Sequence, residues 1–281
     1  MLKILSFINM FLWSVKTTTE HVTKETVQEG APELPNFITL LYAKYGKIAL
    51  VHFLHIWENV VFSLLISLIL GLVAYFSSRR RSLHPGKLQN FMEMIVESLD
   101  DFICGILGPK GRKYTPFLGT LFIYILCMNF LGLVPGMKSP SSSLNTTVAL
   151  AICVFIYVQF TGIKNLGLLG YIDHLAGSPR DVITWVLVPI NLPIHIVGEL
   201  AKPLSLSLRL FGNITGEDIL IAVFVGLGVL TLSFTNLPVG LPLQIPFIFL
   251  AMLTGTIQAL VFTLLSTIYF LLMIPHNDDK P

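Results

Sequence analysis

Charged residues are scarce in this sequence. Asp, Glu, Lys and Arg make up 12% of its 281 residues, whereas 54% are hydrophobic and the mean hydropathy is +0.77. Soluble domains carry about 25% charged residues, so a soluble globular fold is excluded. The composition predicts an all-α, polytopic integral membrane protein embedded in a lipid bilayer. The formal net charge of +2 is too small for a nucleic-acid-binding surface, so no nucleic acid partner is expected.

Cysteine pairs and nucleotide-binding motifs are also missing. The three cysteines, Cys104, Cys127 and Cys153, form no CxxC pair, so neither a disulfide framework nor a cysteine metal site is expected. We interpret them as small buried hydrophobic residues. No GxxxxGK[ST] motif occurs, which excludes a P-loop nucleotide site. We therefore expect no cofactor, no metal ion and no catalytic residues in this chain.

Apolar runs predict about five membrane-crossing helices. The candidates are residues 59–76, 116–135, 145–163, 182–218 and 245–274. Pro189, Pro193 and Pro203 should bend the fourth candidate, because proline lacks an N–H and clashes with the preceding turn. Residues 219–274 contain no charge, and a turn-rich stretch at 236–246 divides them, which predicts a long C-terminal helical hairpin. The last arm is about 45 Å long if straight, so it must tilt to fit a hydrocarbon core of about 30 Å.

The segments between these runs suggest three regions. Residues 1–58 form an N-terminal extracytoplasmic or interfacial segment, whose first 13 residues are either a signal-peptide core or an interfacial helix. Residues 59–274 form the membrane domain, and residues 275–281 form a tail. Residues 88–107 predict an amphipathic helix at the membrane surface or against a partner. Residues 164–180 predict a polar loop.

Basic residues predict the orientation. Residues 79–113 carry seven lysines and arginines (79, 80, 81, 87, 110, 112 and 113), whereas the linker at 136–144 carries only Lys138. Basic loops face the cytoplasm. We therefore expect the N-terminus outside and the C-terminus in the cytoplasm.

One stretch combines charge with membrane depth: HIVGELAKPLSLSLRLFGNITGED, residues 195–218. A charged side chain at the bilayer centre costs about 2.5–3.5 kcal/mol on insertion scales, so Arg209 requires a functional explanation, and an ion or substrate path is the default. An ion pair within the chain explains Lys202, one turn from Glu199, better than it explains Arg209. At 100° per residue, one broad face carries seven polar residues: His195, Glu199, Lys202, Ser205, Arg209, Asn213 and Glu217. The opposite face carries Ile196, Leu200, Leu208 and Leu210.

Four strings resemble one family. KPLSLSLRLFGNITGED at 202–218 is similar to the signature of subunit a of F-type ATP synthases. MNFLGLVPG at 128–136, SLNTTVALA at 143–151 and IQALVF at 257–262, with Tyr269, resemble its second hairpin and final helix. The resemblance covers roughly residues 50–274. It implies a non-catalytic stator subunit of the bacterial inner membrane. Its expected partners are a c-subunit ring, the subunit b peripheral stalk and, indirectly, the ATPase headpiece.

The resemblance also implies residue roles in two proton half-channels. Arg209 would face the carboxylates of the ring, with Asn213 and Gln258 as polar neighbours. Asp218 would be the entry-channel carboxylate, and Glu199 or His195 would serve the other half-channel. Glu217 lies nearer the ring side, or pairs with a neighbouring donor. Some relatives differ at three positions: they have an acid at Gly132, a histidine at Ala251 and a glutamate at His195.

Alternatives remain at this stage. Taken singly, Asn213 and Gln258 are better explained by bonds between helices. Because Arg209 precedes Asn213 by four residues in the string that resembles the family signature, the channel role is favoured. An independent secondary transporter with a charged midplane site is the competing function, although such transporters show paired inverted repeats and none is evident here. A purely structural scaffold leaves Arg209 unexplained.

Overall fold

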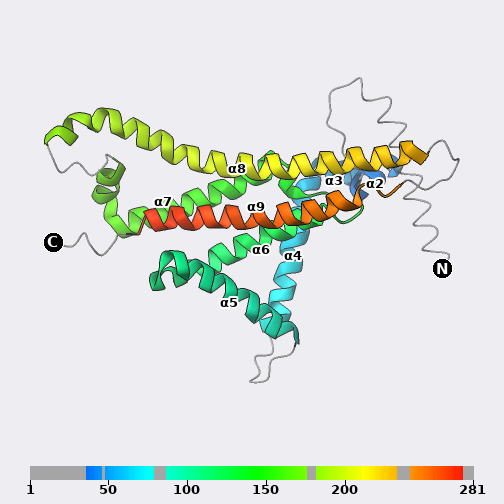
Figure 1. Cartoon of the computed structure of the whole chain (residues 1–281), viewed down its shortest axis with the longest axis horizontal. Helices are drawn as coiled ribbons and strands as arrows, with labels where there is room; N and C mark the ends of the chain where they lie inside the picture. Colours follow the sequence, from blue (N-terminus) through cyan, green and yellow to red (C-terminus); the bar gives the residue numbers. More distant parts are fainter. Residues whose placement is uncertain (1–35, 46–47, 79–86, 176–181, 233–240, 275–281) are drawn as a thin grey trace. The chain divides into compact units, whose positions relative to one another are not determined.

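The computed structural model describes residues 36–45, 48–78, 87–175, 182–232 and 241–274 of the chain. All the secondary structure in these ranges is helical, and the described residues form no strand (Figure 1). Among the described residues, four helices are long and apolar enough to cross a membrane, and a fifth apolar helix of 17 residues is shorter. The predicted all-α membrane fold with about five crossings is therefore confirmed. The candidate signal segment and the C-terminal tail lie outside the described residues.

The described part of the chain begins with three helices. α2 (Phe37–Tyr45) and α3 (Ala49–Ile56) are short, and α4 (Glu58–Ser78) is the first candidate span. The side-chain Oδ1 of Asn36 accepts hydrogen bonds from the backbone N–H and the hydroxyl of Thr39, each 2.8 Å long. This caps the start of α2, where backbone N–H groups have no helical partner.

The predicted amphipathic segment forms α5 (Lys87–Leu107), which a short 3-10 turn, η1 (Pro109–Lys113), joins to α6 (Thr115–Leu131). Ile103, near the end of α5, is fully buried. Phe91 and Met94, nearer its start, are 52% and 56% exposed. One end of the apolar face thus packs on the chain itself, and the other end is left for lipid or a partner.

The α6–α7 hairpin is present, but its second arm is longer than predicted. After η2 (Pro140–Ser142), α7 runs over Leu144–Leu175 and includes residues 164–175, which the sequence predicted as a loop. That prediction is wrong because the break is confined to Gly167, with φ 74° and ψ 166°. Glycine adopts a positive φ without steric cost, so helix continues on both sides of one redirecting residue.

α8 spans Val182–Leu232 as one 51-residue helix with three internal prolines, and α9 spans Ile245–Leu272. The sequence predicted that the helix beginning at residue 182 would end at residue 218, whereas α8 continues for 14 more residues. A straight helix of 51 residues is about 75 Å long, more than twice the hydrocarbon thickness. α8 therefore crosses a bilayer only at a steep tilt, or extends far beyond it.

The described helices divide into two compact units, each taken by itself. Of the described residues, unit 1 contains those within 36–67, 126–143 and 212–257, and unit 2 contains those within 68–125, 144–211 and 258–274. The core of unit 2 includes an aromatic group in which Tyr157 and Phe270 rings pack edge to face, 5.2 Å apart. In unit 1, the rings of Phe224 and Phe247 stack at 3.8 Å and join α8 to α9.

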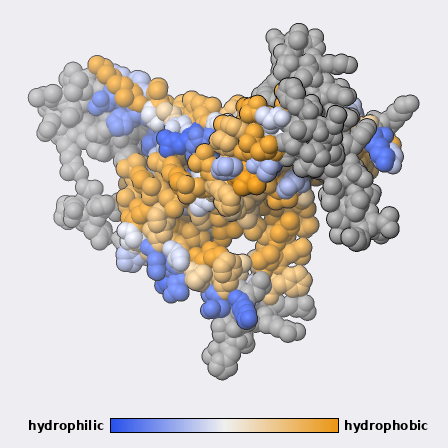
Figure 2. All heavy atoms as spheres, turned by 45° about the vertical axis from the view of Figure 1, so that its right-hand side comes forward, coloured by the Kyte–Doolittle hydropathy of each residue, from blue (hydrophilic) through white to orange (hydrophobic). Residues whose placement is uncertain are grey.

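Apolar side chains also cover the outer surfaces of the described helices. Figure 2 shows orange, hydrophobic atoms over most of the visible helix faces, with blue side chains in separate groups. Leu64 on α4, Ile156 on α7 and Leu253 on α9 are each about 60% exposed. A soluble protein rarely exposes such contiguous apolar area, so these faces fit contact with lipid or with membrane partners.

Candidate functional site in the membrane helices

In unit 2, α8 positions the charged residues of the candidate site. Arg209 is exposed, whereas Glu199 and Lys202 are partly buried against neighbouring helices. Leu204 and Leu208 of the same helix are also exposed, at 58% and 47%. Exposure therefore does not follow the predicted polar and apolar faces: Leu208 of the apolar face is exposed like Arg209, whereas Glu199 and Lys202 of the polar face are partly buried.

The predicted ion pair forms between Glu199 and Lys202. Lys202 Nζ contacts Glu199 Oε1, and both side chains are mostly buried. Within the described ranges, no Asp or Glu lies within ion-pair distance of Arg209. The sequence-based distinction between the two cations is thus confirmed: Lys202 has an acidic partner in this chain, and Arg209 has none among the described residues.

Two residues of α7 complete the surroundings of Glu199. Gln159 Nε2 donates to Glu199 Oε2 at 3.0 Å. Gln159 Oε1 in turn accepts from the hydroxyl of Tyr171 at 2.5 Å. Sequence reasoning missed both residues. Gln159 could have been found, because it is a strongly polar side chain inside the apolar run at 145–163 and such residues usually have a partner.

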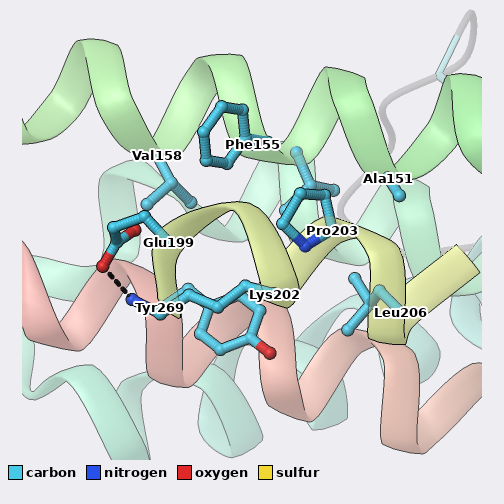
Figure 3. Close-up of a pocket in the computed structure, with 9 residues that line it drawn as sticks. Ala151, Phe155, Val158, Glu199, Lys202, Pro203, Leu206 and Tyr269 are labelled. Carbon is cyan, nitrogen blue, oxygen red and sulfur yellow. Dashed lines mark hydrogen bonds and ion pairs between the residues drawn. The ribbon is translucent and has the colours of Figure 1, made fainter. Parts of the chain in front are cut away.

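A small cleft lies beside this ion pair (Figure 3). Lys202 Nζ lies 5.3 Å from the centroid of the Tyr269 ring of α9, a cation–π distance. The cleft is lined from three helices: Ala151, Val154, Phe155 and Val158 of α7, Glu199, Lys202, Pro203 and Leu206 of α8, and Tyr269 of α9. Charge and aromatic contacts therefore meet at one point between α7, α8 and α9.

The remaining predicted residues of unit 2 differ in exposure. His195 on α8 is exposed, and Gln258 on α9 is buried with 3% exposure. Tyr269 is near enough to both Arg209 and Glu199 for electrostatic interaction with its hydroxyl. The structure thus brings Glu199, Lys202 and Tyr269 together, while His195 stays apart from their hydrogen bonds.

In unit 1, α8 carries the other three predicted residues. Asn213 is exposed, and Glu217 and Asp218 are partly buried. The Glu217 carboxyl group lies close to the hydroxyl of Thr254 on α9. That hydroxyl donates its proton to the backbone carbonyl of Leu250 at 2.9 Å, as threonine in a membrane helix usually does. The pairing of Glu217 with a neighbouring donor therefore stays a prediction.

Asn129 of α6 ties the hairpin of unit 1 to α9. Its Nδ2 donates to the carbonyl of Gly255 at 2.9 Å, and its Oδ1 accepts from Ser141 at 2.7 Å. Thr215 of α8 donates to the carbonyl of Ser142 at 3.3 Å. Both polar groups of the buried Asn129 are therefore engaged, which fits a role in packing the hairpin rather than in lining a wet channel.

Gly132, one of the three departures from the family pattern, is closely covered. A Cβ on this glycine would lie 2.8 Å from Ser139 Cβ and 3.3 Å from the Ser139 backbone nitrogen. An acidic side chain does not fit there unless the segment at 139–142 moves. At the second departure, Ala251 is buried with 3% exposure.

Comparison with known proteins agrees with these features. The family model described as "ATP synthase A chain" matches residues 60–271. ATP synthase subunit a of Protochlamydia amoebophila is 50% identical over 256 residues, covering 91% of this chain and 94% of that protein. ATP synthase subunit a 1 of Syntrophotalea carbinolica is 41% identical over 255 residues, covering 91% and 93%. ATP synthase subunit a of Solidesulfovibrio magneticus is 40% identical over 219 residues, covering 78% of this chain and 85% of that protein.

These matches extend over most of each protein and decide against an independent secondary transporter. They agree with the strings at 128–136, 143–151, 202–218 and 257–262. The chain belongs to the ATP synthase A chain family and is a multi-pass subunit of the membrane sector of a bacterial ATP synthase.

Proposed function

We propose that this subunit is the stator through which protons reach and leave a rotating c-subunit ring, with Arg209 facing the ring. The observation that carries this proposal is the exposed position of Arg209 on an apolar helix, with no described carboxylate of the chain in ion-pair contact. An arginine at membrane depth needs an acidic or polar partner. The ring carboxylates are the partner that the family resemblance supplies.

The chemistry follows from the permanent charge of arginine. A ring carboxylate that approaches Arg209 is favoured in its ionised form and releases its proton. Beyond Arg209, the carboxylate leaves that field and takes up a proton again. The fixed positive charge also opposes direct proton passage between the two half-channels. The ring therefore carries each proton around before release.

The remaining residues divide between two half-channels. Asp218, with Glu217, serves the entry path from outside, and Asn213 and Gln258 are polar neighbours of the essential arginine. Glu199 or His195 serves the inner path. The subunit b peripheral stalk and the ATPase headpiece complete the complex. The N-terminus is outside and the C-terminus is in the cytoplasm, as the basic segment at 79–113 predicts.

Cross-linking to the ring tests this assignment. Leu208 is next to Arg209 and 47% exposed, and Ile156 on α7 is 61% exposed. A cysteine at Leu208 should form disulfides with cysteines on the outer helix of subunit c in intact membranes. A cysteine at Ile156 is the matched control, since it is exposed on another helix and should not react with subunit c. Equal cross-linking of both positions, or of neither, contradicts the proposal.

A further inference from the structure

Glu199, three polar side chains around it and one aromatic ring link α7, α8 and α9 of unit 2. We call Tyr171, Gln159, Glu199 and Lys202, with the Tyr269 ring, the three-helix clamp. Tyr171 donates to Gln159, Gln159 donates to Glu199, and Lys202 pairs with Glu199. Lys202 then lies over Tyr269. Both Glu199 carboxylate oxygens and both ends of the Gln159 amide are thus engaged.

Tyr171 reaches Gln159 only because α7 turns back. The two residues are 12 positions apart, about 18 Å along a straight helix, yet their side-chain atoms are 2.5 Å apart. Gly167 supplies the turn with its positive φ of 74°. A Cβ built on Gly162 would lie 3.3 Å from the Tyr171 ring, so this ring packs directly over Gly162.

The three-helix clamp contacts α8 where prolines remove backbone hydrogen bonds from the helix. Pro203 has no N–H to donate to the carbonyl of Glu199, and Pro193 has none for the carbonyl of Pro189. Missing bonds of this kind permit a helix to bend or twist. Glu199 begins this weakened turn, and Lys202 lies near its end. Arg209 follows Lys202 by seven residues, about 10 Å along a helix. The direction in which Arg209 points therefore depends on how α8 is held at the clamp.

We propose that Gln159 and Tyr171 are positioning residues, which fix the rotation of α8 through Glu199 and Lys202 and so keep Arg209 directed outward. This inference rests on the proposed role of Arg209 and assigns no proton transfer to either residue. An amide is a poor link for proton hopping, whereas its two ends are well suited to hold a carboxylate and a phenol in place.

The state of Tyr171 is consistent with a holding role. Tyr171 lies beyond the apolar span of α7, which ends at Gly167. Burial, and then the charge of Glu199, raise the pKa of the Tyr171 hydroxyl above its usual value. The phenol therefore keeps its proton and remains a hydrogen-bond donor at any physiological pH.

The test compares two clamp variants with one control in the assembled complex. Gln159→Leu removes both hydrogen bonds at similar volume, and Tyr171→Phe removes only the hydroxyl. Tyr157→Phe is the matched control, because it makes the same change on the same helix within the aromatic core. The readouts are protons pumped per ATP hydrolysed in inverted vesicles, and disulfide formation between a cysteine at Leu208 and subunit c.

Loss of one hydrogen bond should shift the balance between aligned and misaligned α8 by roughly two- to tenfold. Pumping per ATP and cross-linking at Leu208 should both fall in Gln159→Leu, fall less in Tyr171→Phe and stay unchanged in Tyr157→Phe. A merely structural role would reduce the amount of complex but not these normalised values. If pumping per ATP and cross-linking are both unchanged in Gln159→Leu and Tyr171→Phe, the positioning role of the clamp is wrong, and the proposed function is not affected. Failure of Leu208 to cross-link in the otherwise unaltered protein overturns the proposed function and the clamp with it.

Discussion

Lys138 Nζ lies 2.9 Å from Glu58 Oε1, and this ion pair joins residues 80 positions apart in the chain. Both side chains are mostly buried, at 19% and 13% exposure. The second oxygen of Glu58 accepts from Asn36 Nδ2 at 3.2 Å. Glu58 thus connects the start of α4, the cap of α2 and the α6–α7 hairpin, all within unit 1.

We predict that charge reversal at either member of this pair weakens unit 1, and that exchanging the two charges restores part of the loss. Pairs of this kind contribute between about 1 kcal/mol when exposed and about 3–5 kcal/mol when one partner of a buried pair is removed. The measurement is the amount of assembled subunit in membranes for Glu58→Lys, Lys138→Glu and the double variant. Recovery in the double variant should be incomplete, because a lysine at position 58 cannot accept from Asn36. No recovery at all would show that the pair itself is unimportant.

Asp100 should fasten the surface helix α5 to the start of α6. Its carboxylate accepts from the Thr115 hydroxyl at 2.7 Å and from Arg112 Nε at 3.0 Å. We predict that Asp100→Ala broadens the distance distribution between spin labels at Val96 on α5 and Thr120 on α6. The neighbouring Asp101→Ala is the control and should leave it unchanged. The same broadening in both variants would contradict a specific role of Asp100.

The same attachment should depend on pH. The hydrogen bond from Thr115, and then the Arg112 guanidinium, hold the pKa of Asp100 below its ordinary value of 3.8. A lowered pKa means that the stabilisation is complete above pH 3.8 and is lost as the pH falls through the lower value of the folded protein. The spin-label distribution of the native sequence should therefore stay narrow at pH 5 and broaden only in stronger acid. An onset of broadening near neutral pH would refute this assignment.

Surface labelling tests the orientation. We predict that a cysteine at Glu97 on α5 reacts with an impermeant thiol reagent only from the cytoplasmic side, because the flanking segments are basic. A cysteine at Val134, which is 47% exposed in the hairpin, should react only from outside. The native cysteines are replaced in both variants. Reaction of both positions from the same side would require a different number of crossings.

Sequence reasoning succeeded where one strong physical term decides the structure. Apolar runs fixed the crossings, and the 3.6-residue period identified α5. The cost of burying charge separated Lys202, which pairs with Glu199, from Arg209, which does not. Sequence reasoning failed where a single backbone torsion angle, or a contact between residues far apart in the chain, decides the structure. The break at Gly167 is confined to one residue, so residues 164–175 are otherwise helical, and no local pattern indicates that Tyr171 returns to Gln159.

The two adjacent acids of α8 give a sharp comparison. Glu217 lies close to the Thr254 hydroxyl, and α8 continues as helix past both acids to Leu232. Neighbouring residues of a helix point about 100° apart, so the two acids serve different surroundings. We predict that Asp218→Asn slows proton entry by roughly tenfold, a barrier of about 1.4 kcal/mol. Glu217→Gln should slow it by only about twofold, because an amide of the same size and polarity remains beside Thr254. Initial rates of ATP-driven pumping, per assembled complex, decide between them. A larger loss in Glu217→Gln reverses the assignment.

The most direct measurement of the central claim is ATP-driven proton pumping by inverted membrane vesicles that carry Arg209→Ala, with passive proton conductance recorded in parallel. The complex should assemble at normal levels, pumping should fall to background, and passive conductance should rise, because the fixed charge between the half-channels is gone. Arg209→Lys should also lose most pumping, since lysine lacks the planar guanidinium and can release its proton. Near-normal pumping in the assembled Arg209→Ala complex would contradict the account.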